Sequence, residues 1–402
     1  EELARTYGTP LYIYSKDRLA ANLNRLDQAL AVNFKKYHIC YAVKANSNPN
    51  LLRIMKEILP SLGGDCSSPG EMYAAELAGI DLKDCIYTGN YESCEDLLLA
   101  VQKNCRLNLD DITSLDRLIE FPDSREISFR LNPGFGKGTF SQIVTAGKEA
   151  KFGIPEFKIN EAYARAKKAG FNKFGIQCMA GSGVLDESYF PELLKAIITA
   201  ARNIEKELDI HFSFLSIGGG FGIPYEDLQT PLDLNRVFKK LSQEFYSNYT
   251  MEDPDTPSLW IEPGKILVGD AGILLTRVNG VKKSYKQYIG LDGGMETFMR
   301  PALYGAYQRL YKIGALDSEA VGKFDFTGPI CENTDRLAVN RAFPQVYEGD
   351  LIALMDAGAY GYAMSHNFNG RPRPAEVLVE NSTHSLLRNR ETIQDLYKNC
   401  NV

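Results

Sequence analysis

FSFLSIGGGFG (residues 212–222) and LWIEPGK (residues 259–265) each begin with an apolar run and end in glycine-rich or polar residues. Short apolar runs bounded by turn residues are typical of buried β-strands. Six more runs of this kind precede them, and helical patterns separate all eight. We therefore predict strands at residues 37–43, 64–67, 85–88, 105–109, 126–131, 173–179, 212–217 and 259–262.

The alternation of strands and helices indicates a parallel α/β fold. The clearest helix is expected at residues 186–208, where apolar side chains recur at helical spacing, and Ser68-Pro69-Gly70-Glu71 has the pattern of a capped helix start. Eight strand–helix units favour a closed (β/α)8 barrel, because an open doubly wound sheet would need a nucleotide-binding fingerprint that we do not find. The barrel is predicted to span residues 31–264.

The sequence changes character after Lys265. Apolar and β-branched runs alternate with turn signals, which predicts a mostly β C-terminal domain. We assign residues 265–402 to it, together with residues 1–30, which carry an extended run at 11–14 and a helix at 16–30. The runs are ILVGDAGILLTRV (266–278), YIGLDGG (288–294), KFDFTGPI (323–330), DLIALMDAGAYGYA (350–363) and AEVLVE (375–380).

Composition excludes several classes of protein. Lys plus Arg is 45 and Asp plus Glu is 51, so the formal net charge is −6, which offers no electrostatic footprint for nucleic acid or an anionic membrane. No run is long enough for a membrane span, and eight scattered cysteines without a C-x-x-C pair indicate free thiols and no zinc site. We expect a soluble cytoplasmic protein, or a plastid protein whose transit peptide has been removed.

Both quoted segments place candidate anion ligands where (β/α)8 barrels commonly bind phosphate, after strands 7 and 8. Gly218, Gly219 and Gly220 lack side chains, so backbone N–H groups can approach an anion, and Glu262-Pro263-Gly264-Lys265 adds a tight turn and a cation. A glycine-rich turn without a ligand is the alternative for either segment alone. The Asn132–Gly147 loop, also glycine-rich, is expected to be flexible, and a phosphate role for it is not favoured.

Strand 1 delivers Lys44 to the mouth of the predicted barrel in YAVKAN (41–46). A partly desolvated lysine can form a Schiff base with an aldehyde, although a lysine that reaches from a strand end into solvent is the alternative. Lys44 with a phosphate cradle predicts pyridoxal 5'-phosphate as cofactor. Glu262 could then keep the pyridine nitrogen protonated, which suits decarboxylation.

Polar residues also end other strands. Ser182 could donate to a phosphate, whereas turn or cap duty is as plausible as ligand contact for Asp65, Asn90, Asp110 and Asn132. In the C-terminal domain, Cys331 next to Glu332 could be a proton donor or an ordinary small apolar residue.

The chain resembles the fold type III pyridoxal-phosphate decarboxylases, and most closely the diaminopimelate decarboxylases, from Tyr7 to Glu380. The motifs that carry this resemblance are YAVKAN (41–46), KFGI (151–154), GGGFG (218–222), EPGK (262–265), RPALYG (300–305), CENTD (331–335), GAY (358–360) and RPRPAEVLV (371–379). It implies an alanine-racemase-like barrel followed by a β domain, and a homodimer whose active sites are built from both subunits.

The resemblance also implies an activity, the conversion of meso-2,6-diaminopimelate to L-lysine and CO2. Lys44 would carry the cofactor, and Cys331 of the partner subunit would donate the proton that replaces CO2. The cofactor-binding residues would be Lys44, Asp65, Met179, Ser182, Gly218, Gly219, Gly220, Glu262, Gly264, Lys265 and Tyr360. The substrate-binding residues would be Lys265, Arg300, Tyr304, Glu332 and Tyr360.

Three residues depart from the family pattern. Met179 stands where the family usually has His, Lys265 where it has Arg, and Asn333 where it has Ser. These departures motivate an alternative substrate, another diamino acid or an amino-acid conjugate. A racemase is disfavoured by Glu262, because family racemases have Arg at the pyridine nitrogen, and a non-catalytic relative is disfavoured by the retained Lys44.

Overall fold

The computed structural model describes residues 1–118, 126–316 and 318–401. The chain divides into two compact units. Unit 1 comprises Glu1–Ala20, Pro224–Gln229 and Leu267–Val402, and unit 2 comprises Ala21–Ile223 and Thr230–Ile266.

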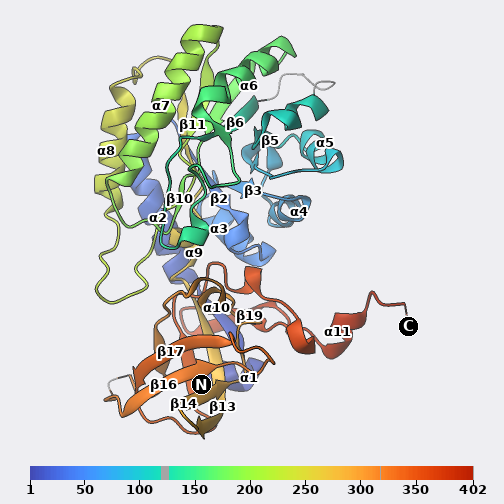
Figure 1. Cartoon of the computed structure of the whole chain (residues 1–402), viewed down its shortest axis with the longest axis vertical. Helices are drawn as coiled ribbons and strands as arrows, with labels where there is room; N and C mark the ends of the chain where they lie inside the picture. The colour runs from blue at the N-terminus through green and yellow to red at the C-terminus, as the bar shows by residue number, and fades with distance from the viewer. Residues whose placement is uncertain (119–125, 317, 402) are drawn as a thin grey trace. The chain divides into compact units, whose positions relative to one another are not determined.

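Unit 2 is a closed barrel of parallel strands, which confirms the predicted fold class. Within the described ranges eight strands follow one another around the barrel, and the pairing of β5 with β6 closes the ring. Helices lie outside the strands (Figure 1). In barrel order the strands are β2 (Tyr37–Ala42), β3 (Gly63–Cys66), β4 (Ile86–Tyr87), β5 (Arg106–Leu109), β6 (Glu126–Asn132), β9 (Lys173–Gln177), β11 (Phe212–Ser216) and β12 (Ser258–Ile261).

The barrel strands are nearly continuous apolar runs because helices cover their outer faces while their inner faces meet in the core. Cys40, Ile86, Phe214 and Trp260 form one buried cluster from four of the strands. The ring of Phe214 stacks on Trp260 with their centroids 4.5 Å apart. This interior is a packed core, so chemistry is confined to the ends of the strands.

Unit 2 contains the helices that separate the barrel strands along the chain. They are α3 (Pro49–Ile58), α4 (Pro69–Leu77), α5 (Cys94–Gln102), α6 (Glu156–Lys168), α7 (Tyr189–Leu208), α8 (Leu234–Tyr246) and the residues of α2 (Lys16–Asn33) from Ala21 on. Ser68 caps α4 as predicted by accepting the N–H of Glu71, but the Glu71 carboxylate accepts from Ser67 N and not from the cap residue.

Helix α7 begins three residues later than expected, because the side chain of Asp186 accepts the N–H and the hydroxyl of Ser188 and folds residues 186–188 into a turn.

Unit 1 is built on a large mixed sheet. Its strand order is β17-β16-β14-β13-β1-β19-β20, and β18 pairs with both β13 and β15. The strands are β1 (Leu11–Ser15), β13 (Gly272–Lys283), β14 (Gln287–Leu291), β15 (Leu310–Lys312), β16 (Gly322–Thr327), β17 (Arg336–Phe343), β18 (Leu351–Leu354), β19 (Ala375–Glu380) and β20 (Thr383–Arg388). The short helices of this unit are α1 (Glu2–Tyr7), α10 (Arg300–Tyr304) and α11 (Ile393–Tyr397).

The centre of this sheet explains why Glu1–Ala20 belong to unit 1. Leu11 of β1 lies opposite Leu275 of β13 on one side and Ala375 of β19 on the other. Leu11, Leu275, Ala353 and Val377 pack in one buried cluster. The first strand of the chain is therefore a central strand of a sheet made mostly from residues beyond 267.

Two apolar runs of the C-terminal half are not continuous strands. The run from Ile266 opens in a helical turn, α9 (Lys265–Val268), and β13 begins only at Gly272. The run from Asp350 is a strand only as far as Leu354, because Asp356 and Tyr360 both have positive φ, near 56°. A left-handed residue ends an extended strand, so the segment after Leu354 forms a loop.

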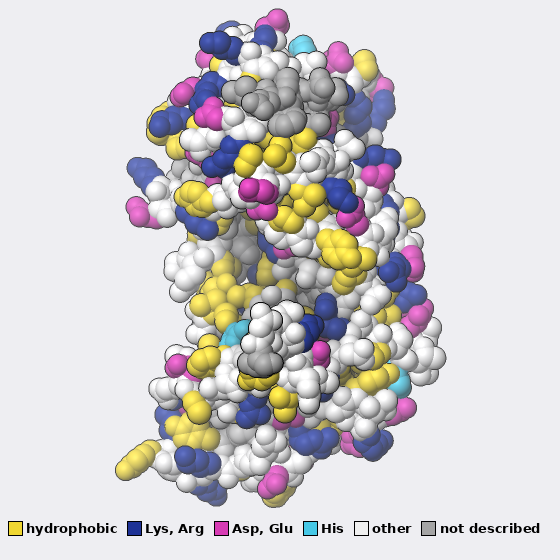
Figure 2. Space-filling model, turned by 90° about the vertical axis from the view of Figure 1, so that its right-hand side faces the viewer, with side chains coloured by type: hydrophobic (Ala, Val, Ile, Leu, Met, Phe, Trp, Pro, Cys, Tyr) yellow, Lys and Arg dark blue, Asp and Glu magenta, His cyan; other side chains and the backbone are white. Residues whose placement is uncertain are grey.

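Among the described residues no helix has the length and apolar character needed to cross a membrane. On the face drawn in Figure 2, Lys and Arg side chains are interspersed with Asp and Glu, with no large region of one sign among the described residues.

Candidate active site

The amine of Lys44 lies at the carboxyl end of β2, in the helical turn Val43–Ala45. Its Nζ donates to Oδ2 of Asp65 at 2.6 Å, and the Asp65 side chain is only 2% exposed. Ala42 and Asp65 are paired across β2 and β3, so the barrel register brings Lys44 and Asp65 together. The second oxygen of Asp65 is buried without a hydrogen-bond partner in the structure. A reactive amine and a carboxylate thus share one side of the barrel mouth.

Glu262 lies just beyond β12 and is buried. Burial raises the pKa of its carboxyl to about 7, and the neighbouring charge of Asp65 adds to the increase. Hydrogen bonds from Ser216 and Gln177 and the charge of Lys44 act in the opposite direction. Glu262 is therefore an acid that can gain or lose a proton near neutral pH.

The glycine-rich turn packs directly against Glu262 and Met179. Gly218 and Gly220 have φ of 64° and 90°, which side chains rarely tolerate. A Cβ at Gly219 would collide with the carbonyl oxygen of Glu262, and one at Gly218 would lie 2.9 Å from Met179 Sδ. The turn can exist only with glycine at these positions.

Two N–H groups of this turn are already engaged. Gly218 donates to Ser216 Oγ at 3.1 Å, and Gly219 donates to Met179 Sδ at 3.2 Å. A thioether is a weak acceptor, so an anion could replace it with a gain in hydrogen-bond strength. Met179 thus accepts a hydrogen bond from the glycine-rich turn, a role that the sequence alone does not predict.

Ser182, Gly183 and Lys265 form the other side of the turn. Ser182 lies in β10 (Gly181–Ser182), which pairs with β7 (Lys137–Gly138). A Cβ at Gly183 would lie 3.0 Å from Lys265 Nζ, so the buried Lys265 reaches the backbone next to Ser182. Gly264, directly before Lys265, is buried in the same turn.

These groups fit pyridoxal 5'-phosphate by their chemistry. Lys44 offers an amine to an aldehyde, the glycine turn with Ser182 and Lys265 offers donors and a cation to a phosphate, and Glu262 offers a carboxylate to a pyridine nitrogen. The orphaned oxygen of Asp65 and the weakly satisfied N–H of Gly219 indicate a site with unused capacity for a polar ligand.

Sequence reasoning missed three buried polar residues of this site, Arg130, Gln177 and Ser216. The barrel register pairs Arg130 with Gln177, and Gln177 with Ser216, so they lie side by side on β6, β9 and β11. Each stands near the carboxyl end of a predicted apolar strand, the signal that singled out Lys44.

Arg130 connects these three strand-end residues to the loops that follow the strands. Its guanidinium lies 3.6 Å from Asp110 and donates to the carbonyl oxygens of Thr145 and Met179, both at 3.1 Å. Burial lowers the pKa of Arg130 and raises that of Asp110. Asp110 also accepts the side-chain N–H of Asn90 at 2.6 Å and the N–H of Gly153 at 3.1 Å. Asp110 therefore joins Arg130, Asn90 and the backbone of Gly153, so its described contacts hold loops in place.

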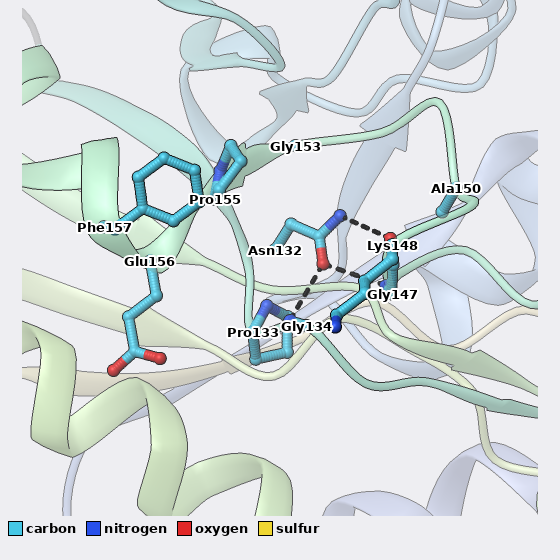
Figure 3. Close-up of a pocket in the computed structure, with 10 residues that line it drawn as sticks. All are labelled: Asn132, Pro133, Gly134, Gly147, Lys148, Ala150, Gly153, Pro155, Glu156 and Phe157. Atoms are coloured by element: carbon cyan, nitrogen blue, oxygen red, sulfur yellow. Dashed lines mark hydrogen bonds between the residues drawn. The ribbon is translucent and has the colours of Figure 1, made fainter.

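Asn132 holds both ends of the glycine-rich loop after β6. Its Oδ1 accepts the N–H groups of Gly134 and Gly147 at 3.0 and 2.9 Å, and its Nδ2 donates to the carbonyl oxygen of Gly147 at 3.0 Å (Figure 3). Nδ2 also donates to the carbonyl oxygen of Phe152 at 3.0 Å. A cavity of about 430 Å³ opens beside it, lined by Pro133, Lys148, Pro155, Glu156 and Phe157 among others. Turn formation, one of the alternatives for Asn132, is what the geometry shows.

Unit 1 carries the predicted substrate residues. The Arg300 side chain is buried, and its guanidinium lies 4.4 Å from the ring centre of Tyr225. Arg300 Nη1 also donates to Gln308 Oε1 at 3.5 Å. Tyr304 ends the same short helix, α10, and is half-buried.

Cys331 and Glu332 lie in an exposed loop between β16 and β17. Asn369 accepts the Cys331 N–H at 2.7 Å, and Glu332 Oε1 accepts the N–H of Thr334 at 3.2 Å. Buried Asp335 accepts the N–H groups of Met295 and Ile330 at 2.6 and 3.1 Å and so pins the base of the loop. Tyr360, with positive φ, is half-buried in the loop after β18.

Comparison with known proteins gives a consistent picture. Residues 17–269 match the family described as "Pyridoxal-dependent decarboxylase, pyridoxal binding domain". The chain is 39% identical to diaminopimelate decarboxylase of Methanothermobacter thermautotrophicus, over 100% of this chain and 94% of that protein. It is 34% identical to Protein TabA of Pseudomonas amygdali pv. tabaci, over 98% and 92%.

The fold agrees with the sequence match. A solved structure of diaminopimelate decarboxylase from Helicobacter pylori, complexed with L-lysine, superposes with a TM-score of 0.88 at 31% identity, over 99% of this chain and 98% of that one. Together with a barrel mouth whose residues fit the cofactor, these matches establish that the chain belongs to the pyridoxal-phosphate-dependent decarboxylases.

Proposed function

We propose that this protein decarboxylates meso-2,6-diaminopimelate to L-lysine and CO2. The observation that carries the chemistry is the convergence of Lys44, Asp65 and buried Glu262 at one end of the barrel, with Lys44 and Glu262 close enough for their charges to interact. The full-length similarity to a named diaminopimelate decarboxylase supports the choice of substrate.

Pyridoxal phosphate, when bound, supplies an aldehyde for an amine and a protonated ring that accepts the electron pair released with CO2. Lys44 Nζ is the amine that would bind it, and Asp65 holds that amine in place with a 2.6 Å hydrogen bond. Glu262, as a carboxylate, would keep the pyridine nitrogen protonated. Gly218, Gly219, Gly220 and Ser182 would hold the phosphate, together with the cation of Lys265.

Cys331 supplies the proton that replaces CO2. The bond between the α-carbon and the carboxylate breaks, CO2 leaves without the bonding electron pair, and the Cys331 thiol gives its proton to that carbon; water then restores the thiol. Cys331 is exposed in the single chain. That exposure suits a group that acts in the site of a partner subunit, and we propose a homodimer with shared sites.

The distal end of the substrate carries a carboxylate and an ammonium. Arg300 can bind the carboxylate and Glu332 the ammonium through charge-assisted hydrogen bonds. Tyr304 and Tyr360 would complete the substrate contacts, and Tyr360 would also contact the cofactor. A diamino acid without a distal carboxylate, such as lysine or ornithine, would offer Arg300 no anion to bind. We therefore expect the enzyme to discriminate against such substrates.

A related diamino acid or an amino-acid conjugate is the second candidate substrate. Met179 favours it, because a thioether stands where the family usually has an imidazole facing the cofactor ring. The sulfur of Met179 accepts the N–H of Gly219 instead. Lys265 favours it as well, since an ammonium lacks the planar fork with which arginine binds a carboxylate.

The test is CO2 release from meso-diaminopimelate, lysine and ornithine by the purified protein with pyridoxal phosphate, with products identified by mass spectrometry. We expect lysine from diaminopimelate at about 1 per second or faster, and much slower release from lysine and ornithine. A better rate on another substrate would reject diaminopimelate while leaving the cofactor and reaction class intact.

A further inference from the structure

Glu262 is held by two neutral hydrogen-bond donors from neighbouring strands. Ser216 Oγ donates to Glu262 Oε1 at 2.6 Å, and Gln177 Nε2 donates to Oε2 at 2.7 Å. Ser216 and Gln177 are 0% and 1% exposed, so water cannot take their place. Each carboxylate oxygen therefore has its own fixed donor.

Ser216 also connects Glu262 to the glycine-rich turn. Its Oγ accepts the N–H of Gly218 at 3.1 Å while its own hydrogen goes to Glu262. A second bond, from Glu262 N to Gly218 O at 2.8 Å, runs parallel to this connection. The carboxylate and the first residue of the turn are thus fixed relative to each other by two independent contacts.

Packing of the barrel alone does not explain why residue 177 is a glutamine. Its Oε1 is buried with no hydrogen-bond partner in the structure, which costs free energy that an apolar side chain would avoid. The hydrogen bond to Glu262 is the described interaction that offsets this cost. A role in the site explains why a polar residue stands inside the barrel at this position.

We propose that Ser216 and Gln177 are positioning residues that keep Glu262 ionised against the cofactor's pyridine nitrogen, and that Ser216 also fixes the distance between that nitrogen and the phosphate turn. The proposal rests on the assignment of Glu262 to the pyridine nitrogen in the proposed function. Neither residue touches the reacting atoms; both act through Glu262.

The physical argument is a competition for one proton. A carboxylate that accepts two hydrogen bonds is a weaker base than one that accepts none, so the shared proton stays on the pyridine nitrogen. Loss of either donor makes Glu262 more basic and draws the proton towards it, which leaves a neutral ring and a poorer electron sink. The titratable or charged groups that face Glu262 are Asp65, Lys44, Arg130, Cys40 and Cys178.

The test uses the holoenzyme reconstituted with pyridoxal phosphate carrying ¹⁵N in the ring, whose chemical shift distinguishes a protonated from a neutral nitrogen. Ser216→Ala and Gln177→Met each remove one donor, and Glu262→Gln gives the shift without a carboxylate. Ser128→Ala is the matched control, because Ser128 is equally buried in the barrel but donates to Asn108 Oδ1 and Leu107 O.

We expect Ser216→Ala and Gln177→Met to lower the apparent pKa of the ring nitrogen by about one unit or more, a tenfold change typical of losing a hydrogen bond to a charged group. kcat should fall about tenfold with KM nearly unchanged. Ser216→Ala, but not Gln177→Met, should also raise the Kd for pyridoxal phosphate. Ser216→Thr, which keeps the hydroxyl, should restore the wild-type shift, and Ser128→Ala should behave as the wild type.

Wild-type ¹⁵N shifts in both donor variants, with an altered shift in Glu262→Gln, would overturn the proposal while leaving Glu262 at the pyridine nitrogen. An unaltered shift in Glu262→Gln would overturn it for another reason, that Glu262 does not face the ring. The ¹⁵N shift is measured without a substrate, so it does not depend on which amino acid the enzyme acts on. A failure on diaminopimelate is therefore separate from a failure here.

Discussion

Lys44 is the residue on which cofactor binding depends most directly. Lys44→Ala removes the amine that Asp65 now holds at 2.6 Å. We expect the variant to lose the visible absorption of bound pyridoxal phosphate and its decarboxylase activity together. The melting temperature should fall as well, because the variant leaves the buried Asp65 carboxylate without the cation that now donates to it. An unchanged absorption spectrum would mean that another lysine binds the cofactor.

Substitution of Cys331 should lower the activity of the protein without lowering its stability. Cys331→Ala removes the proposed proton donor, and general acid catalysis is typically worth about 10²- to 10⁴-fold in rate. We expect kcat to fall within that range, with wild-type unfolding, because the side chain is exposed. Cys94→Ala, another exposed thiol, is the control and should leave kcat unaltered. Equal kcat in the two variants would contradict the role.

At the scale of elements, the loop after β6 depends on a single side chain. Asn132→Ala deletes the hydrogen bonds that join Gly134, Gly147 and Phe152, each worth about 1 kcal/mol. We expect trypsin to cut the loop at Lys137, Lys148 or Lys151 at least about tenfold faster. Peptide mass spectrometry over a time course measures this rate.

Gln142→Ala is the control for that experiment, because Gln142 is an exposed residue of the same loop whose described side-chain contact is with the adjacent Ser141. Equal cleavage rates in the two variants would show that Asn132 does not hold the loop closed.

The same scale shows what sequence could predict. The eight barrel strands were predictable because most are short buried apolar runs and helical patterns separate all of them; β3 (Gly-Gly-Asp-Cys) is an exception in its composition. Strands β15, β17 and β20 were not, since β17 mixes buried and exposed positions around Asn340, with its φ of 53°, and β20 is a largely exposed edge strand. Their pairing partners, and not their own composition, make them strands.

For the site, Lys44, the glycine turn and Glu262 could be predicted because each stands out within its own segment. Arg130, Gln177 and Ser216 could not, because their importance comes from neighbours on other strands. Register between strands is a property of the closed barrel, so no local pattern reports that Ser216 and Gln177 both reach Glu262. The hydrogen bond from Gly219 to Met179 Sδ escaped prediction for the same reason.

At the scale of the whole molecule, Glu262 should leave a signature in the pH dependence of stability. Its pKa is raised to about 7 in the folded chain, against about 4.3 for an unperturbed Glu. Between these values the folded state holds a proton that the unfolded state has lost. The free energy of unfolding therefore falls as pH rises through this window, by up to about 4 kcal/mol.

Urea unfolding of the cofactor-free protein at pH 5 and pH 7.5 measures this effect. Glu262→Gln has no such proton to lose, so its stability should decline less over the interval than that of the wild type. Parallel declines would show that Glu262 titrates in its ordinary range.

The position of β1 has a consequence for how the protein is made in the cell. Leu11 pairs with Ala375 of β19, so β1 meets its parallel neighbour only after about 360 more residues have been translated. At about 5–20 residues per second, that wait lasts roughly 20 to 70 seconds. Until β13 has been made, about 260 residues after β1, both edges of this apolar strand are open to wrong partners, and the edge that pairs with β19 stays open for the whole wait. Nascent chains of this protein should therefore need a chaperone at β1 until β19 has been synthesised.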